Sequence, residues 1–144
     1  IFLFGTVSYH KDHKELEKTF SKFYSSLKEG GCFIFNVGFI KDFWKNPRNS
    51  VDIVEKNREK LILYSEYLSR GNKLTKQSYY TFIDLKGAPL VQKGYHEFTL
   101  FSIKEFEKVL QKTGFRYHIY IDFSKKKWNN QAQQGSLATF VCYK

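Results

Sequence analysis

The sequence lacks methionine altogether and has only two cysteines among its 144 residues. Cys32 and Cys142 both stand within apolar runs, where a free cysteine acts as a small hydrophobic side chain, and two cysteines form no disulfide framework. This pattern predicts a reducing, cytoplasmic location. Because there is no methionine and the chain begins inside the apolar run of residues 1–4, we expect a longer protein whose amino-terminal part precedes it.

Long apolar runs and low-complexity tracts are also missing. No run approaches the roughly 18 apolar residues that cross a bilayer, and no leader precedes the first predicted strand, so we expect no membrane segment. Hydrophobic residues nevertheless make up 42% of the chain and aromatic residues 19%. The composition therefore predicts one folded domain with a core rich in aromatic rings.

Acidic residues are the minority among the charges. Lys and Arg number 24 against 14 Asp and Glu, a net charge of +10, which favours anionic partners such as phosphates or nucleic acid. Only residues 125–127 form a lysine run, and the other lysines are scattered over predicted helix faces and turns. We therefore interpret most of them as solvated surface and do not expect specific nucleic-acid binding.

Common catalytic and metal-binding patterns are absent. The four histidines have no ligand spacing with one another or with the cysteines, so we predict no metal site. The sequence has no G-x-S-x-G elbow, no phosphate-binding loop and no recognisable pair of nucleophile and base, which leaves hydrolase functions unsupported.

The chain is organised around residues 28–39, KEGGCFIFNVGF. The pair Gly30 and Gly31 is predicted to end a helix, and the apolar run 32–37 is predicted to be a strand covered on both faces, as in a parallel sheet. Ligands of open α/β sheets bind just beyond the carboxyl ends of such strands. We therefore expect Asn36 to Phe39 to lie at the functional site.

The residues before this strand predict a βαβ unit. Residues 1–4 are predicted to be a strand and residues 6–10 the loop that leaves it. Asp12, with Glu15 three residues later, can cap the next helix as in a capping box. The apolar stripe of this helix consists of Leu16, Phe20, Phe23, Tyr24 and Leu27. The helix should pack on the sheet, with a right-handed crossover.

Residues 38–50 combine several aromatic rings with polar residues, a composition that favours neither a helix nor a strand. The segment is interpreted either as a lid or as a loop held to the body by its rings. Residues 60–69, 74–85 and 90–101 then read as strands of an antiparallel meander separated by turn signals. Without a crossover helix, residues 51–101 are interpreted as an insertion in an α/β core formed by residues 1–50 and 102–144.

The carboxy-terminal part gives clear helix and hairpin signals. Ser102 and Glu105 predict a capping box, Phe101 and Phe106 a hydrophobic staple, and Gly114 the helix end. Residues 115–123 and 137–143 are predicted strands that are easily joined antiparallel.

Several strings in this order resemble a known family: FLFGTVSYH, a capped helix, LKEGGCFIFNV, a meander ending YHEFTLFS, a helix ending KTGF and a closing hairpin. Over essentially the whole chain they resemble the carboxy-terminal portion of class I S-adenosylmethionine-dependent methyltransferases. The nearest subgroup is the N-methyltransferases of nucleotide-linked amino sugars, followed by small-molecule enzymes of the glycine N-methyltransferase type.

The resemblance implies a Rossmann-like sheet in which residues 1–4 form the fourth strand, residues 32–37 the fifth, and the closing hairpin the last two. The family's glycine-rich loop and the acidic residue that holds the cofactor ribose belong to earlier strands, which this sequence lacks. We therefore expect roughly one hundred further residues before Ile1, enough for three βα units, and expect these 144 residues alone to be inactive.

The resemblance also implies roles for individual residues. Thr6, Val7 and Ser8 would lie by the methionine part of S-adenosylmethionine. Tyr9 stands where the amino-sugar enzymes have histidine, and His96 matches a histidine before their T-L-F string; both are the catalytic candidates. A tyrosine packed on the next helix and a structural histidine at a strand edge are the alternatives.

Residues near the acceptor follow from the same resemblance. Asn36 is expected to hydrogen-bond the cofactor or substrate, or else the loop backbone. Phe39, Phe43 and Trp44 are expected to pack on the small-molecule acceptor, or else to be core rings.

Two functions are thus compared: a methyltransferase of a nucleotide-linked small molecule, and a non-catalytic basic module that binds anionic partners such as nucleic acid. A homodimer is compatible with the methyltransferase hypothesis.

Overall fold

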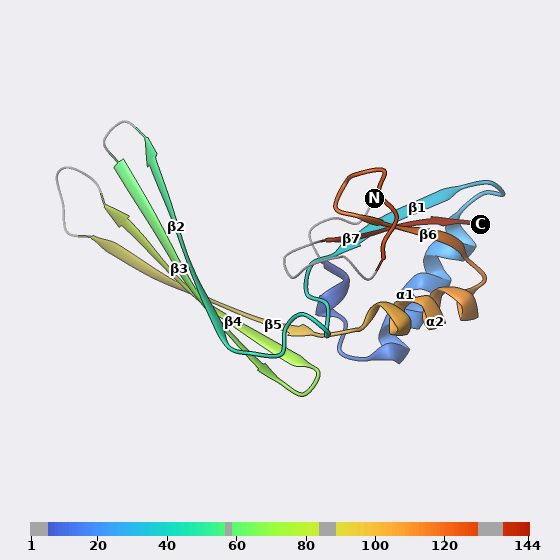
Figure 1. The fold of residues 1–144 in the computed structure, drawn as a ribbon, viewed down its shortest axis with the longest axis horizontal. Coiled ribbons are helices and arrows are strands. Elements are labelled where there is room, and N and C mark those ends of the chain that lie inside the picture. Colours follow the sequence, from blue (N-terminus) through green and yellow to red (C-terminus); the bar gives the residue numbers. More distant parts are fainter. Residues whose placement is uncertain (1–5, 57–58, 84–88, 130–136) are drawn as a thin grey trace. The chain divides into compact units, whose positions relative to one another are not determined.

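The structure, a computed structural model, describes residues 6–56, 59–83, 89–129 and 137–144 (Figure 1). The predicted strand at residues 1–4 lies outside them. The chain divides into two compact units, one formed by Ile1–Trp44 and Thr99–Lys144 and the other by Lys45–Phe98.

The first unit is an α/β structure built on a three-stranded sheet in the order β1-β7-β6. β1 is Cys32–Val37, β6 is Arg116–Ile121 and β7 is Ala138–Tyr143. β7 pairs antiparallel with both neighbours, so the predicted strand at 32–37 and the predicted closing hairpin are confirmed. The predicted parallel partner of β1 lies outside the described residues.

Two α-helices cover one face of this sheet (Figure 1). α1 is His13–Ser26, and the Asp12 side chain accepts a hydrogen bond from Glu15 N at 2.9 Å, as the sequence predicts. The return bond differs from a capping box, because Glu15 Oε2 accepts from Lys11 N rather than from the cap residue. The bond from Glu15 N satisfies an amide group that the first helical turn leaves without a partner, and the bond from Lys11 N holds the residue before the cap.

α2, Ile103–Thr113, has the complete capping box between Ser102 and Glu105. Its staple is also present, since the rings of Phe101 and Phe106 are 5.3 Å apart between centroids. Gly114 ends the helix in the left-handed conformation, with φ +91°. The signals for this helix are local, and the predicted helix is confirmed.

The prediction that Gly30 and Gly31 end α1 is wrong. The helix ends at Ser26, and Leu27 is an extended C-cap whose N–H reaches the carbonyls of Phe23 and Tyr24. Gly30, with φ +73°, shapes the turn into β1 instead. The helix stops early because residue 27 turns its side chain toward the core, where it packs against the buried cluster.

The core between the helices and the sheet is centred on Phe35. Its ring centroid lies 5.1 Å from that of Phe20 on α1, 5.7 Å from that of Phe106 on α2 and 4.6 Å from that of Phe140 on β7. Tilted and stacked ring pairs at such distances add to the free energy gained by burial. The predicted ring-rich core is therefore present, and it packs both helices against the sheet.

The second unit is a four-stranded sheet in the order β2-β3-β4-β5. The strands are β2 Arg48–Lys56, β3 Glu59–Arg70, β4 Lys73–Ile83 and β5 Leu90–Thr99. β2 with β3 and β3 with β4 are antiparallel, and the hydroxyls of Ser65 and Ser78 meet across β3 and β4 at 3.1 Å.

Two predictions about this region need correction. Residues 48–50 belong to β2 rather than to the loop, because their backbone pairs with β3. The predicted third strand reaches only to Thr99, and residue 101 instead forms an isolated parallel bridge with Ile40.

Candidate functional site

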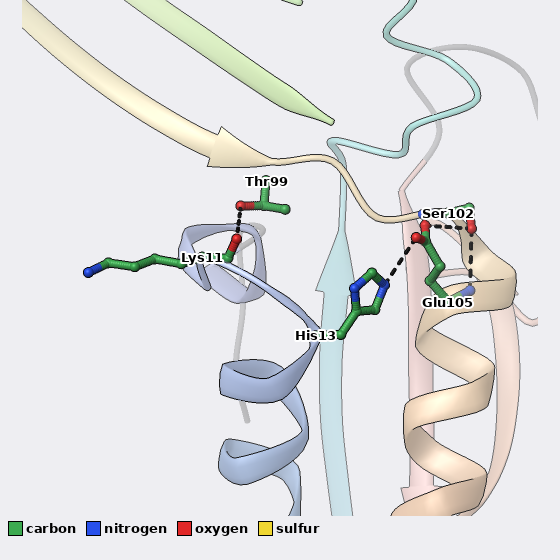
Figure 2. A network of polar contacts seen from close by, with 5 residues as sticks. All are labelled: Lys11, His13, Thr99, Ser102 and Glu105. Carbon is green, nitrogen blue, oxygen red and sulfur yellow. Dashed lines mark hydrogen bonds and ion pairs between the residues drawn. The ribbon is translucent and has the colours of Figure 1, made fainter. Parts of the chain in front are cut away.

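The segment Thr6–Tyr9 forms a short 3-10 helix, η1, where the sequence predicted a loop. η1 contacts β1 and lies beside its carboxyl end (Figures 1 and 2). This end of the strand is where the sequence placed the functional site. Val7 and Ser8 are fully buried, whereas Tyr9 is 50% exposed.

Tyr9 lines a shallow depression of about 320 Å³ on the first unit. The other lining residues are Thr6 and His10 and, from the start of α1, Glu15 and Thr19. Of the predicted residues of this segment, the depression thus contains Thr6 and Tyr9. The Val7 side chain belongs to the hydrophobic core, so it anchors the turn.

His10 connects η1 to α1. Its Nδ1 lies 2.8 Å from the Val7 carbonyl oxygen, and its Nε2 lies 2.9 Å from Thr19 Oγ1. The Val7 carbonyl also accepts the His10 backbone N–H at 3.3 Å, which closes the 3-10 turn. Both ring nitrogens are therefore occupied by contacts within this unit.

Ser8 carries the one polar atom of η1 that is both buried and unsatisfied by the described residues. Its side chain has no exposed surface, and its Oγ has no hydrogen-bond partner in the described parts of the chain. A buried hydroxyl without a partner costs free energy, so such a group is suited to bonding a polar ligand.

Asn36 is fully buried in β1, opposite Thr139 of β7. Beyond the strand, Phe39 and Trp44 lie together, with ring centroids 5.3 Å apart, and Trp44 Nε1 donates to the Gly38 carbonyl at 3.1 Å. The predicted acceptor residues Phe39 and Trp44 are thus brought together just past β1.

Phe43 points elsewhere. Its ring lies 6.1 Å from that of Trp128, and both line a separate cavity of about 820 Å³. The walls come from residue Ile40, the first turn of α2, β6 and residues 127–129. The structure therefore does not group Phe43 with Phe39 and Trp44.

His96 lies on β5 in the second unit, with its ring stacked on that of Phe98 at 5.9 Å between centroids. All the other predicted site residues belong to the first unit. The catalytic role of His96 stays a prediction of the family resemblance.

Polar contacts join the last residue of β5 and the start of α2 to the residues around the start of α1 (Figure 2). Thr99 Oγ1 donates to the Lys11 carbonyl at 3.3 Å, and His13 Nε2 lies 3.0 Å from Glu105 Oε1. Glu105 Oε2 also accepts from Ser102 N at 2.7 Å. Lys11 and His13, which follow Tyr9 in the chain, are thereby held by Thr99 and by Glu105.

Glu105 is the charged centre of these contacts. Its partial burial raises the pKa of the carboxyl, but the hydrogen bonds from Ser102 and the nearby charges of Lys41 and His13 lower it more, so that the pKa lies below its usual value. Asp12 behaves similarly, because the Glu15 backbone N–H lowers its pKa. Both carboxylates therefore remain ionised at neutral pH.

Sequence reasoning missed His10 and Thr19. Their only signal in the sequence is that a histidine directly follows Tyr9. The contact between them spans nine positions and depends on how η1 lies on α1, which periodicity does not reveal.

Among the described residues, no group of three or more His, Cys, Asp or Glu side chains is placed to hold a metal ion. None of the helices in the described ranges is long and apolar enough to span a membrane.

No protein-family model matches the sequence, and no curated protein matches it significantly. Solved structures do share its fold. DesVI of Streptomyces venezuelae matches with a TM-score of 0.80 and 21% identity, over 97% of this chain and 55% of its own. An S-adenosylmethionine-dependent methyltransferase from Clostridium acetobutylicum ATCC 824 matches with a TM-score of 0.80 and 18% identity, over 98% and 55%.

A third structure is CalS10, an amino pentose methyltransferase from Micromonospora echinaspora, with S-adenosylmethionine bound. It matches with a TM-score of 0.79 and 12% identity, over 96% of this chain and 55% of its own. The chain thus spans about 55% of the length of these three proteins. The resemblance to S-adenosylmethionine-dependent methyltransferases is confirmed at the level of the fold.

Proposed function

We propose that this chain is the carboxy-terminal part of an S-adenosylmethionine-dependent methyltransferase that modifies the amine of a nucleotide-linked sugar. The observation that supports this most is the fold. Between 96% and 98% of the chain matches methyltransferase structures, one of which is an amino pentose methyltransferase. In this proposal, residues outside this chain supply the glycine-rich loop and the acidic residue that hold the cofactor.

Residues of η1 fit a role at the cofactor. The buried Ser8 hydroxyl, without a partner among the described residues, is suited to a polar group of a ligand, and Thr6 is exposed beside it. In the proposal Thr6 and Ser8 contact the methionine part of the cofactor, and Val7 fixes the turn through the core. S-adenosylmethionine supplies an electrophilic methyl group when it is bound.

Tyr9 is proposed to orient the acceptor. An amine that attacks in line needs to be neutral, close and aligned, so no strong base is required. A tyrosine hydroxyl both donates and accepts hydrogen bonds, so it is suited to holding the amine in position. Its half-exposed position on the depression leaves it accessible to a ligand.

The acceptor is proposed to be bound by Asn36 and by the paired rings of Phe39 and Trp44, with Phe43 as a further candidate. The net charge of +10 favours a nucleotide-linked acceptor, because its phosphates are anionic. The contribution of residues 51–101, with His96, to acceptor binding is a further part of the proposal.

The experiment uses the complete protein that contains this chain, S-adenosylmethionine and a panel of nucleotide-linked sugars. We expect S-adenosylhomocysteine to form, and mass spectrometry to show an added methyl group, only with sugars that carry an amine. A matched nucleotide-linked sugar with a hydroxyl in place of the amine is the control. Absence of transfer to every amino sugar, together with salt-sensitive binding of nucleic acid, would instead support the basic binding module.

A further inference from the structure

We infer that His10 is a positioning residue, which fixes η1 so that Tyr9 is presented to the acceptor. The inference goes beyond the proposed function, since no role was predicted for His10 or Thr19, and it rests on that function for the meaning of Tyr9. It starts from the two contacts of the His10 ring, at 2.8 Å and 2.9 Å.

The first contact determines the tautomer of His10. The Val7 carbonyl oxygen can only accept, so the Nδ1 atom 2.8 Å away must carry the proton. In the neutral ring Nε2 is then an acceptor, and the Thr19 hydroxyl donates to it. Both contacts have distances typical of hydrogen bonds.

These contacts exclude His10 as the group that touches the acceptor. Its two ring nitrogens are already bonded within the unit, and neither is left for a ligand. Tyr9, the preceding residue, is half exposed on the depression that His10 and Thr19 also line. His10 therefore acts through Tyr9.

The connection matters because η1 is only four residues long. A single short turn of this kind has few internal hydrogen bonds and poor geometry, so its backbone is not rigid by itself. The core holds Val7 and Ser8 from one side, and the His10 ring joins the end of η1 to α1 from the other. Because η1 is held both at Val7 and Ser8 and at His10, the direction of the Tyr9 side chain between them is restricted.

Nuclear magnetic resonance of the complete protein tests the geometry without relying on activity. We expect the neutral imidazole of His10 to carry its proton on Nδ1 and to have an unprotonated Nε2. The opposite tautomer would overturn the inference. Replacing Thr19 by Val should shift the Nε2 resonance and the Tyr9 ring signals, while Thr19→Ser should restore both.

Kinetics of the same protein tests the role. We expect His10→Phe, which keeps a ring but loses both bonds, to lower kcat/KM for the acceptor about tenfold, with the S-adenosylmethionine Kd unchanged. Thr19→Val should have a smaller effect, and Thr19→Ser, which keeps the hydroxyl, should recover most of the activity that Thr19→Val loses. Ser25→Ala is the control, because the Ser25 hydroxyl is exposed on the same helix and donates to the Lys22 carbonyl within that helix.

The double variant with Tyr9→Phe separates a positioning role from a purely structural one. If His10 acts through the Tyr9 hydroxyl, His10→Phe should add little to the loss caused by Tyr9→Phe. If the wild type is active and the double variant loses kcat/KM by the product of the two single losses, the role of His10 is overturned while the proposed function stands. A wild-type protein without any methyl transfer would overturn the proposed function and, with it, the role of His10 toward the acceptor.

Discussion

Tyr9 is the residue whose chemistry is easiest to test. Its half-exposed ring lies on a depression beside the end of β1, and the proposed function assigns its hydroxyl to the acceptor. We expect Tyr9→Phe in the complete protein to lower kcat/KM about 10- to 100-fold, equivalent to ~1.4 to 2.8 kcal/mol of transition-state positioning. Affinity for the cofactor should hardly change, because only the acceptor loses a hydrogen bond.

Tyr120→Phe is the matched control, since Tyr120 lies on β6 and does not line the depression around Tyr9. If Tyr9→Phe keeps the wild-type turnover on a confirmed acceptor, Tyr9 is a packing residue. The search for the acceptor-binding group would then begin at His96.

Glu105 allows a prediction about pH. Its pKa is lowered in the folded state relative to the ordinary value of 4.5, so the folded state binds this proton less readily than the unfolded state. The resulting stabilisation is present above about pH 4.5 and is lost as the pH falls through the lower folded pKa. In urea unfolding, the difference between wild type and Glu105→Gln should therefore shrink from about pH 6 to about pH 3.

Glu29→Gln provides the comparison, because the Glu29 side chain is 87% exposed and 3.7 Å from Lys144. Its difference from wild type should be small throughout. A difference for Glu105→Gln that grows toward acid would contradict the assigned contacts.

At the scale of elements, the end of α2 depends on Gly114. An alanine at this position would have to adopt a φ of +91°. Its Cβ would also lie 3.2 Å from the Tyr24 ring of α1. The left-handed conformation alone costs an L residue about 1–2 kcal/mol. We expect Gly114→Ala to lower the free energy of unfolding by at least that amount, measured by urea denaturation.

Gly30→Ala separates the two causes. Gly30 also has a positive φ, +73°, but a Cβ there meets nothing within 4 Å. It should therefore show the backbone cost without the steric one. Equal losses for both variants would mean that the Tyr24 ring moves aside freely.

The aromatic loop at residues 38–47 is the element whose behaviour on ligand binding is open to test. It is held by the bond from Trp44 to Gly38 and by the bond from Lys41 N to the Phe101 carbonyl. If it is a lid, hydrogen exchange of its amides in the complete protein should slow when S-adenosylhomocysteine is bound. Equal exchange with and without this ligand would leave the loop as a structural one held by its rings.

At the scale of the molecule, the described helices cover only one face of the first unit's sheet. The opposite face carries Ile34, Val141 and Tyr143, all partly exposed, and no helix of the described residues packs on it. The proposal that a further part of the protein completes the fold is consistent with this face. We expect calorimetry to detect S-adenosylmethionine binding to the complete protein and little binding to these 144 residues alone.

Tight binding of S-adenosylmethionine by the isolated 144 residues would contradict that expectation. It would also require a cofactor site made without the glycine-rich loop of the family. Circular dichroism of the isolated chain is the necessary control, because an unfolded chain would fail to bind for another reason.

The sequence by itself determined the elements whose signals are local. The capping residues Asp12, Ser102 and Glu105, the glycine at 114 and the apolar run of β1 all act within a few positions along the chain. Backbone hydrogen bonds at helix ends and the burial of a continuous apolar run need no distant partner to be recognised. The α/β fold class followed from these elements, and the proposal of a site at the end of β1 started from them.

Only the tertiary structure decided the features that depend on distant residues. β2 was missed because most of its side chains are exposed and it is defined by pairing with β3. Packing likewise decides that Trp44 bonds to the Gly38 carbonyl whereas Phe43 lies against Trp128. It also decides the bond between His10 and Thr19. The physical reason is that a side chain's partner is fixed by the contacts of the folded core, which the periodicity of a single segment does not contain.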